Sequence, residues 1–172
     1  MEQQVVLLRG INVGGHRKLP MKELCSILEG LGAVKVRTYI QSGNVVAEGE
    51  LQSAEIAEMI ENTKGFLPQV MVFHAADFLN IAKQVPFDEP DGKLAHIWFP
   101  TGSFTFNQEK ADSLLAEGET LSVAEKAIYL HAPDGIGRSK LAANIEKLAG
   151  VPCTARNLNT VNQLLEMLEN PA

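Results

Sequence analysis

The stretch from Val34 to Val46, VKVRTYIQSGNVV, decides how the first half of the chain is expected to fold. Apolar or β-branched side chains occupy every second position of its first part, which is the period of a β-strand: Val34, Val36, Thr38 and Ile40. Ser42-Gly43-Asn44 then has the composition of a tight turn, and Val45-Val46 begins a second apolar run. The stretch therefore predicts a β-hairpin.

The segments on either side of this hairpin each predict a helix and a strand. The run from Gln4 to Arg9 is densely apolar and indicates a buried strand. After Pro20, apolar side chains recur at helical spacing, at Met21, Leu24, Leu28 and Leu31. Beyond the hairpin, Ser53 is positioned to cap a helix that Gly65 closes, and Gln69 to Phe73 is strand-like. Residues 1–75 thus have the order βαββαβ.

The second half repeats this order after a connector. Residues 76–85 have the pattern of a short helix, and the acidic, Pro- and Gly-rich loop that ends at Gly92 is the best internal boundary. The later helices are expected to be capped by Asn107 and Ser139, and a closing helix contains Val161, Leu164, Leu165 and Leu168. The expected strands are Leu94–Phe99, Thr120–Val123, Ala127–His131 and Pro152–Ala155.

We therefore predict an α+β fold of two ferredoxin-like units, each an α/β plait of order βαββαβ. The first unit spans residues 1–75, residues 76–92 form a connector helix and loop, and residues 93–172 hold the second unit with the C-terminal helix. We expect two antiparallel four-stranded sheets, each with its helices packed on one face.

Composition and charge exclude several classes of protein. The 172 residues are 45% hydrophobic with a net charge of −6, which argues against non-specific nucleic-acid binding, because that binding needs a basic field. Cys25 and Cys153 cannot form a disulfide framework, and no Cys/His spacing fits a metal. No run approaches the roughly 20 apolar residues of a membrane span. We expect a cytoplasmic protein with no cofactor, no metal and no membrane partner.

Arginine usage points to loops as candidate binding sites. All five arginines lie in or beside segments rich in Gly, Asn and Ser, whereas the predicted helices use lysine: Arg9, Arg17, Arg37, Arg138 and Arg156. The planar guanidinium suits bidentate recognition of phosphate or carboxylate, so this distribution favours an anion site. Ion pairs that hold the loops together are the alternative explanation.

Four segments supply the candidate ligand-binding residues. The Gly-rich loop from Arg9 to His16 lies between a strand and a helix, where backbone N–H groups can hold an anion, although it has neither a P-loop nor a GxGxxG sequence. Asp134 to Lys140 is the stronger case, because two glycines lead to a helix start with two cations beside it. The first hairpin and the start of the last helix complete the set: Arg9, Asn12, Gly14, Gly15, Tyr39, Gln41, Arg138, Ser139, Lys140, Arg156 and Asn157. Turn formation and helix capping are the alternative roles, above all for the Ser and Asn residues.

No catalytic constellation stands out. His131 lies three residues from Asp134, but no Ser or Cys nucleophile can be paired with it. Cys25, on a predicted helix face, is expected in the core. The strand after Asn44 also lacks the stacking aromatic side chains of an RNA-recognition sheet. Whether the protein is an enzyme stays open at this point.

Four separated motifs resemble a bacterial family, the domain of unknown function 1697. They are LLRGINVGGHRKLPMKEL, VRTYIQSGNVV, YLHAPDGIGRSKL and TARNLNTVNQLLEML, and the match in order and spacing covers about Val5 to Leu168. The resemblance implies two ferredoxin-like plaits in one chain, and it supplies no activity. One departure is Leu158, where the family usually has tryptophan. If that tryptophan stacks on a ligand, this protein differs from the family in affinity or specificity. If the tryptophan only packs, Leu158 changes little.

The leading hypothesis from the sequence is binding of an anionic, phosphate-bearing or nucleotide-like small molecule at the junction of the two plaits. Arg9, Asn12, Arg138 and Arg156 are then expected to face a shared cleft. Nucleic-acid binding and a protein-interaction module without a ligand are the alternatives. The net charge and the missing aromatic side chains count against nucleic-acid binding.

Overall fold

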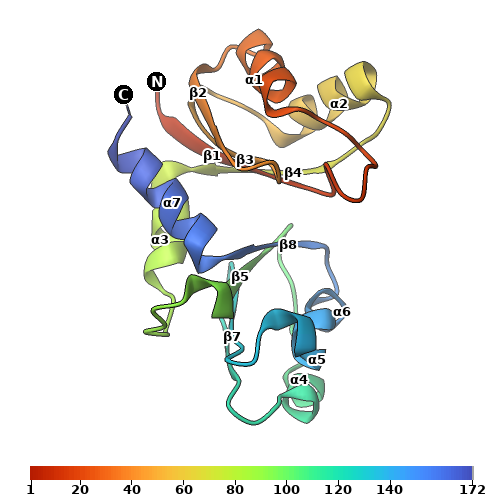
Figure 1. Cartoon of the computed structure of the whole chain (residues 1–172), viewed down its shortest axis with the longest axis vertical. Helices are drawn as coiled ribbons and strands as arrows, with labels where there is room; N and C mark the ends of the chain where they lie inside the picture. Colours follow the sequence, from red (N-terminus) through yellow and green to blue (C-terminus); the bar gives the residue numbers. More distant parts are fainter. Residues whose placement is uncertain (172) are drawn as a thin grey trace. The chain divides into compact units, whose positions relative to one another are not determined.

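Two four-stranded antiparallel sheets organise the chain, one in each half of the sequence (Figure 1). The computed structural model describes residues 1–171. The chain separates into two compact units: unit 1 comprises Met1–Asn80 with the residues from Gln163 onward, and unit 2 comprises Ile81–Asn162. Each unit boundary falls within a helix, one in α3 (Ala75–Lys83) and the other in α7 (Leu158–Glu169). The predicted α+β class is confirmed.

Unit 1 has the predicted βαββαβ order. Its sheet has the strand order β2-β3-β1-β4 with antiparallel neighbours, which is the ferredoxin-like arrangement. Helices α1 and α2 cover one face of this sheet (Figure 1). The elements are β1 (Gln3–Arg9), α1 (Met21–Gly30), β2 (Val34–Tyr39), β3 (Asn44–Glu48), α2 (Ser53–Lys64) and β4 (Gln69–His74).

Strand register brings three connections of unit 1 to one end of its sheet. Arg9, the last residue of β1, pairs with Gln69, the first residue of β4, and Leu7 pairs with Asn44 at the start of β3. The β1–α1 loop, the β2–β3 turn and the α2–β4 loop therefore lie at this end. We call residues 10–20, 40–43 and 65–68 the loop end of unit 1.

The central strand β1 is buried on both faces, which explains its continuous apolar run. Val6 and Leu8 pack with side chains of both helices, including Leu24 and Ile56. On the opposite face, Val5 and Leu7 are also fully buried. A strand covered on one face alone would show the alternation of apolar and polar residues.

Unit 2 repeats the topology, with the strand order β6-β7-β5-β8 and antiparallel neighbours. Trp98, Ile128 and Leu130 pack against Leu141 and Ile145 in its core. The strands are β5 (Ala95–Pro100), β6 (Thr120–Val123), β7 (Ile128–His131) and β8 (Cys153–Asn157). The helices are α4 (Gln108–Leu114), α5 (Lys140–Ala143) and α6 (Ile145–Ala149), with 3-10 turns at Gly92–Leu94 and Ile136–Arg138.

Three local features differ from the sequence predictions. Ser53 is the first residue of α2 and does not cap it; the capping position is Gln52, which makes no side-chain hydrogen bond. The helix predicted after Ser139 is two short helices, because Asn144 interrupts it. The regular alternation predicted for β2 is broken by a register shift between Val34 and Arg37.

Across residues 1–171, no helix combines the length and the apolar character needed to cross a bilayer.

Candidate functional site

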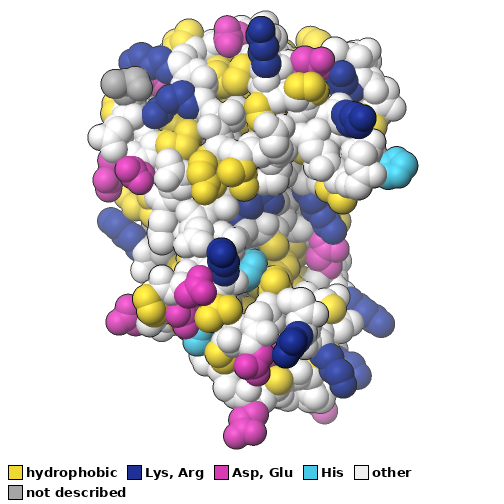
Figure 2. All heavy atoms as spheres, in the orientation of Figure 1, with side chains coloured by type: hydrophobic (Ala, Val, Ile, Leu, Met, Phe, Trp, Pro, Cys, Tyr) yellow, Lys and Arg dark blue, Asp and Glu magenta, His cyan; other side chains and the backbone are white. Residues whose placement is uncertain are grey.

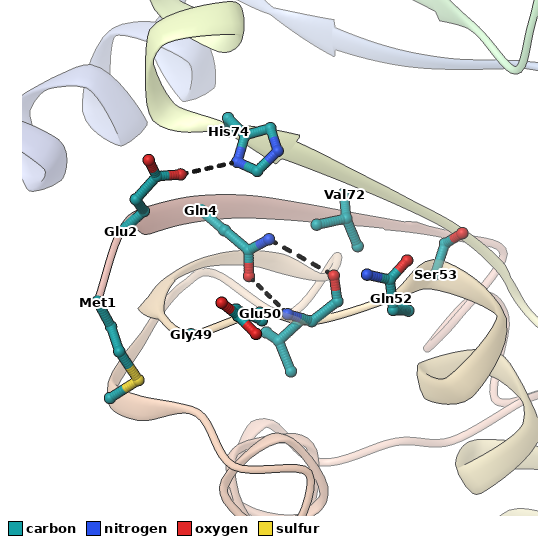
Figure 3. Close-up of a pocket in the computed structure, with 10 residues that line it drawn as sticks. Met1, Glu2, Gln4, Gly49, Glu50, Gln52, Ser53, Val72 and His74 are labelled. Atoms are coloured by element: carbon teal, nitrogen blue, oxygen red, sulfur yellow. Dashed lines mark hydrogen bonds and ion pairs between the residues drawn. The ribbon is translucent and has the colours of Figure 1, made fainter.

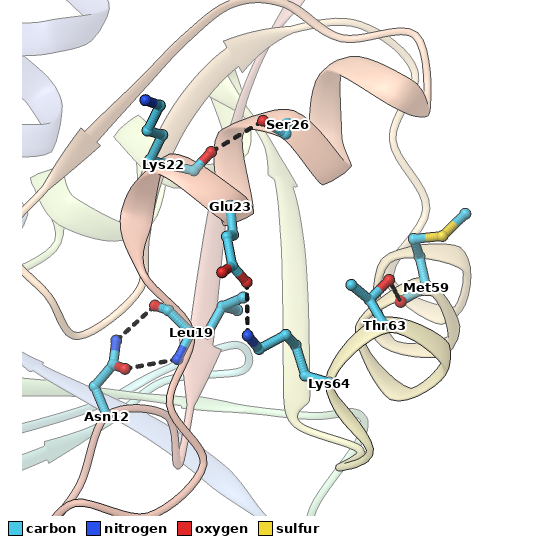
Figure 4. Close-up of polar contacts among 8 residues, drawn as sticks. All are labelled: Asn12, Leu19, Lys22, Glu23, Ser26, Met59, Thr63 and Lys64. Carbon is cyan, nitrogen blue, oxygen red and sulfur yellow. Dashed lines mark hydrogen bonds and ion pairs between the residues drawn. The ribbon is translucent and has the colours of Figure 1, made fainter.

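Asn12 fixes the conformation of the β1–α1 loop at the loop end of unit 1 (Figure 4). Its Nδ2 donates to the carbonyl oxygens of Leu19 and Gln41, both at 2.8 Å, and its Oδ1 accepts from the Leu19 N–H at 2.7 Å. Asn12 has a φ of 53°, in the left-handed region that asparagine tolerates better than most residues. These bonds close the loop on itself and fasten it to the β2–β3 turn. Asn12, predicted as a ligand contact, therefore has a structural role.

The tip of the same loop is a two-residue turn. The N–H of His16 donates to the carbonyl oxygen of Val13 at 2.9 Å, and the residues between them, Gly14 and Gly15, have φ values of 57° and 78°. Positive φ at both central positions is the pattern of a type I′ turn, which glycine adopts without strain. Both glycines are exposed, so their backbone faces solvent.

The β2–β3 turn packs closely beneath this loop. Gly43 has a φ of 88°, and its carbonyl oxygen accepts from the Leu8 N–H at 2.8 Å. A Cβ at Gly43 would lie 2.7 Å from the Cβ of Leu8, so only glycine fits. Asn44 is fully buried, and its Nδ2 donates to the Tyr39 carbonyl oxygen. The predicted residues Tyr39 and Gln41 are therefore held at the loop end, Tyr39 half-buried and Gln41 exposed.

The segments that form the loop end contain basic residues but no acidic ones. Residues 3–22 contain Arg9, Arg17, Lys18 and Lys22 but no Asp or Glu, although the chain has 21 acidic residues. Residues 36–47 and 62–76, which contain the other two connections, also have none. Figure 2 shows Lys and Arg side chains exposed where Figure 1 draws the β1–α1 loop of unit 1. These segments therefore contribute positive charge at this end of a protein of net negative charge.

Two contacts shape this positive surface. The guanidinium of Arg17 lies over the ring of Phe66, 6.0 Å from its centre, which joins the β1–α1 loop to the α2–β4 loop. Lys64 pairs with Glu23 in the first turn of α1 at 2.7 Å (Figure 4), so that carboxylate is already neutralised.

Arg37 serves the fold of unit 1. Its guanidinium donates to the carbonyl oxygens of Met167 and Asn170 at the C-terminal end of α7, both at 2.7 Å. Helix C-termini carry a partial negative charge and unpaired carbonyl groups, which a guanidinium satisfies. Arg37 therefore has a structural role, through backbone carbonyl groups rather than through the ion pairs considered as the alternative for the arginines.

In unit 2, the predicted anion-binding loop, Asp134 to Lys140, has only some of the features that bind an anion. The Oγ of Ser139 accepts from the Ala142 N–H at 3.0 Å, which confirms the cap predicted from the sequence. The helix that it caps, α5, has four residues, so its dipole is small. Arg138 and Lys140 are exposed, and within residues 1–171 neither side chain makes a hydrogen bond or ion pair. This loop could therefore bind an anion mainly through the exposed side chains of Arg138 and Lys140.

The last strand of unit 2 carries Arg156 and Asn157. Burial lowers the pKa of the Arg156 guanidinium to about 10, and its Nη1 donates to the Ala155 carbonyl oxygen at 2.9 Å. The Oδ1 of Asn157 accepts from the Thr160 N–H at 2.9 Å and caps α7, as the sequence suggested. Leu158 is buried.

Sequence reasoning missed a pair formed by Glu89 and His131. The Oε2 of Glu89 lies 2.7 Å from the Nε2 of His131, and the ring of Phe87 lies against the imidazole at 5.6 Å. The N–H of Asp91 donates to Oε1 of Glu89, and this bond, followed by the one with His131, lowers the pKa of the carboxyl. The pair fastens the acidic loop to β7. Its sequence signal, a Glu in a Pro-rich boundary loop, is too common to identify it.

A surface cavity of about 610 Å³ lies at the opposite end of unit 1 (Figure 3). The carboxylate of Glu2 lies 3.2 Å from Nδ1 of His74 at its rim, and Gln4 makes two hydrogen bonds with the backbone of Leu51 in its wall. None of the predicted site residues lines this cavity.

The structure divides the predicted site residues between the units. Unit 1 contains six of them at or beside its loop end: Arg9, Asn12, Gly14, Gly15, Tyr39 and Gln41. Unit 2 contains the other five: Arg138, Ser139, Lys140, Arg156 and Asn157. The shared cleft therefore stays a prediction.

Residues 1–171 form no cluster of His, Cys, Asp or Glu suited to a metal. Burial raises the pKa of the half-buried Cys25 thiol, which disfavours a reactive thiolate.

Comparisons with known proteins identify a family model that matches the first 129 residues and a solved structure similar to most of the chain. The model of a family described as protein of unknown function (DUF1697) matches residues 1–129. No curated protein matches significantly. Among solved structures, the chain is similar to conserved bacterial protein SP0830 from Streptococcus pneumoniae, with 25% sequence identity and a TM-score of 0.73. The similarity covers 97% of this chain and 98% of that one, so both ferredoxin-like units are part of the shared architecture.

Proposed function

The chain belongs to the DUF1697 family of proteins of unknown function, and for this member we propose binding of a phosphate-bearing anion at the loop end of unit 1. The observation that carries the proposal is the segment 3–22, which holds four Lys or Arg residues and no carboxylate. In a chain of net charge −6, such a segment attracts anions that the rest of the surface repels.

The fixed conformation of the loop supports binding of a defined ligand. Asn12 holds the loop through three side-chain hydrogen bonds, so the backbone that carries the cations does not need to be ordered when a ligand arrives. Pre-organisation of this kind lowers the entropic cost of binding. A loosely solvated run of lysines has no such anchoring.

Individual residues take distinct roles in this proposal. Arg17 and Lys18 contact phosphate oxygens, Arg17 with its guanidinium oriented by the Phe66 ring. The exposed backbone of Gly14 and Gly15 allows close approach of the ligand. The exposed side chain of Gln41 lies at the edge of this proposed anion site. We place this binding in the cytoplasm, where the free thiols Cys25 and Cys153 are stable.

The test is calorimetric titration of the full chain with pyrophosphate, a nucleoside monophosphate and glycerol 3-phosphate. A charge-assisted hydrogen bond contributes about 1.5–3 kcal/mol, so Arg17→Ala combined with Lys18→Ala should weaken binding tenfold or more. The matched control is Lys110→Ala combined with Lys126→Ala, which removes the same charge from exposed positions of unit 2. The control should bind like the unaltered protein.

A second double variant tests the loop of unit 2. If Arg138→Ala with Lys140→Ala weakens binding while the Arg17 and Lys18 changes do not, the anion site belongs to that loop and the loop end of unit 1 is not the site. If none of the three phosphate compounds binds, the proposed function is wrong.

A further inference from the structure

The loop end of unit 1 also exposes aliphatic side chains that a simple anion site does not need. Val13 is 63% exposed, Ile40 53% and Leu67 55%. Among the described residues, Met1 at the chain end is the only other large apolar residue that is more than half exposed. Exposed apolar groups gathered in one place mark interaction surfaces.

These three side chains come from three different connections of one sheet end. Val13 lies in the β1–α1 loop, Ile40 in the β2–β3 turn and Leu67 in the α2–β4 loop. The bond from Asn12 to the Gln41 carbonyl joins the first two connections beside Val13 and Ile40. The contact of Arg17 with Phe66 joins the first and third connections beside Leu67. The aliphatic residues therefore lie at the same end of the sheet as the cations of the β1–α1 loop.

We propose that the loop end of unit 1 docks on the surface of a bilayer containing anionic phospholipid. Val13, Ile40 and Leu67 enter the boundary between headgroups and acyl chains, while Arg17 and Lys18 contact lipid phosphates. The inference rests on the proposed phosphate-binding function and names the phosphate as a lipid headgroup. It also departs from our sequence-based expectation of no membrane partner, which rested on the lack of a spanning segment. A protein can lie on a bilayer without spanning it.

Charge and side-chain chemistry together favour a bilayer over other anionic partners. An anionic leaflet attracts basic segments, and the three connections at this end contain no Asp or Glu that would oppose the attraction. Single-stranded nucleic acids are bound largely through aromatic stacking, whereas the exposed apolar groups here are aliphatic and the nearby Tyr39 and Phe66 are half-buried. Aliphatic side chains beside cations match the layered chemistry of acyl chains beneath phosphates.

Co-sedimentation of the full chain with vesicles tests this inference. Vesicles of phosphatidylglycerol and phosphatidylcholine in equal amounts should bind the protein, and vesicles of phosphatidylcholine alone should not. The triple change Val13→Ser, Ile40→Ser and Leu67→Ser should reduce binding at least tenfold. Arg17→Ala with Lys18→Ala should reduce it about 25-fold, because each cation near an anionic surface contributes about 1 kcal/mol, a factor of about five.

A matched control variant shows whether vesicle binding depends on the loop end of unit 1 rather than on any exposed apolar side chain. Met59→Ser with Leu115→Ser removes exposed apolar side chains from two helical regions elsewhere and should leave vesicle binding unchanged. Denaturant midpoints establish that every variant is folded. Equal binding of the triple variant and the unaltered protein would show that the aliphatic residues do not enter the bilayer, and the inference would be wrong.

The outcome is separable from that of the proposed function. If glycerol 3-phosphate or pyrophosphate binds through Arg17 and Lys18 while anionic vesicles do not bind, the proposed function stands and membrane docking is wrong. Binding of a single-stranded oligonucleotide or an acidic polypeptide, with no vesicle binding, likewise overturns docking and identifies another class of partner. Vesicle binding lost in both the charge and the aliphatic variants supports the inference.

Discussion

Asn12 and Leu19 are joined by two hydrogen bonds that run in opposite directions. The Nδ2 of Asn12 donates to the carbonyl oxygen of Leu19, and the N–H of Leu19 donates to the Oδ1 of Asn12. The side-chain amide thus pairs with the backbone as a neighbouring strand would. Leu19 is fully buried, so this pairing fastens the loop to the core of unit 1.

Replacing Asn12 by alanine should destabilise the protein by about 2–3 kcal/mol. The change removes three hydrogen bonds, each with a net contribution of about 0.5–1.5 kcal/mol, and it places a less tolerant residue at a φ of 53°. Urea denaturation of the two proteins measures the difference. Asn62→Ala, at an exposed position of α2, is the control and should shift the midpoint little. Equal shifts would mean that the loop contributes nothing to stability.

Gly43→Ala should be considerably more destabilising than Gly65→Ala. Both glycines have φ values near 85°, at 88° and 84°, so both substitutions incur a backbone penalty of about 1–2 kcal/mol. A Cβ at Gly65 meets nothing within 4 Å, whereas at Gly43 it meets the Cβ of Leu8 at 2.7 Å. Overpacking adds about 1–3 kcal/mol. Thermal midpoints of the two variants isolate this steric contribution, and equal midpoints would contradict the packing described for the turn.

The fold could be predicted from the sequence because its signals are local. The alternation and turn composition of Val34–Val46 specify a hairpin without reference to the rest of the chain, and the apolar spacing around it specifies the helices. The interruption of the helix after Ser139 was missed, since apolar residues keep helical spacing across Asn144. The broken alternation in β2 depends on Lys35 adopting a φ of 51°, which residue type alone does not reveal.

The candidate site was harder to predict, because the roles of its polar residues depend on partners that are distant in the sequence. Asn12 binds a carbonyl group 29 residues away, and Arg37 binds one 130 residues away. A polar residue in a Gly-rich loop has the same sequence signature whether it binds a ligand or the backbone. Burial of Val13, Ile40 or Leu67 was equally undetermined, since sequence spacing does not show which apolar residues a loop leaves outside the core.

Arg37→Ala should destabilise the protein by about 1.5–3 kcal/mol through loss of the contacts at the end of α7. The part-buried hydrogen bond from the charged guanidinium to the Met167 carbonyl oxygen accounts for this range, and the exposed bond to the Asn170 carbonyl oxygen adds little. Lys35→Ala is the control, because Lys35 is 58% exposed and its pair with Glu48 at 3.2 Å should contribute less than about 1 kcal/mol. Similar urea midpoints for the two variants would show that α7 does not depend on Arg37.

Thr154→Val should leave stability unchanged or raise it by about 1 kcal/mol. Thr154 is fully buried, and its hydroxyl makes no hydrogen bond within residues 1–171. An unsatisfied buried polar group carries a desolvation cost that a valine of similar shape avoids. Thr63→Val is the comparison, because that hydroxyl donates to the Met59 carbonyl oxygen at 2.7 Å. A loss of stability in Thr154→Val would indicate a bonded hydroxyl in solution.

Acid should weaken unit 2 through Glu89. Hydrogen bonds from the Asp91 N–H and from His131 lower the pKa of the Glu89 carboxyl below its ordinary value of 4.5. A lowered acid pKa means that the folded state favours the carboxylate, so the stabilisation is complete above the ordinary value and is lost as pH falls through the lowered one. Glu89→Gln should therefore be less stable than the unaltered protein at neutral pH, and the gap between their urea midpoints should narrow below about pH 4.5. Glu58→Gln, at an exposed position of α2, should show no such convergence. A gap that stays constant with pH would mean that the Glu89 charge does not stabilise the fold.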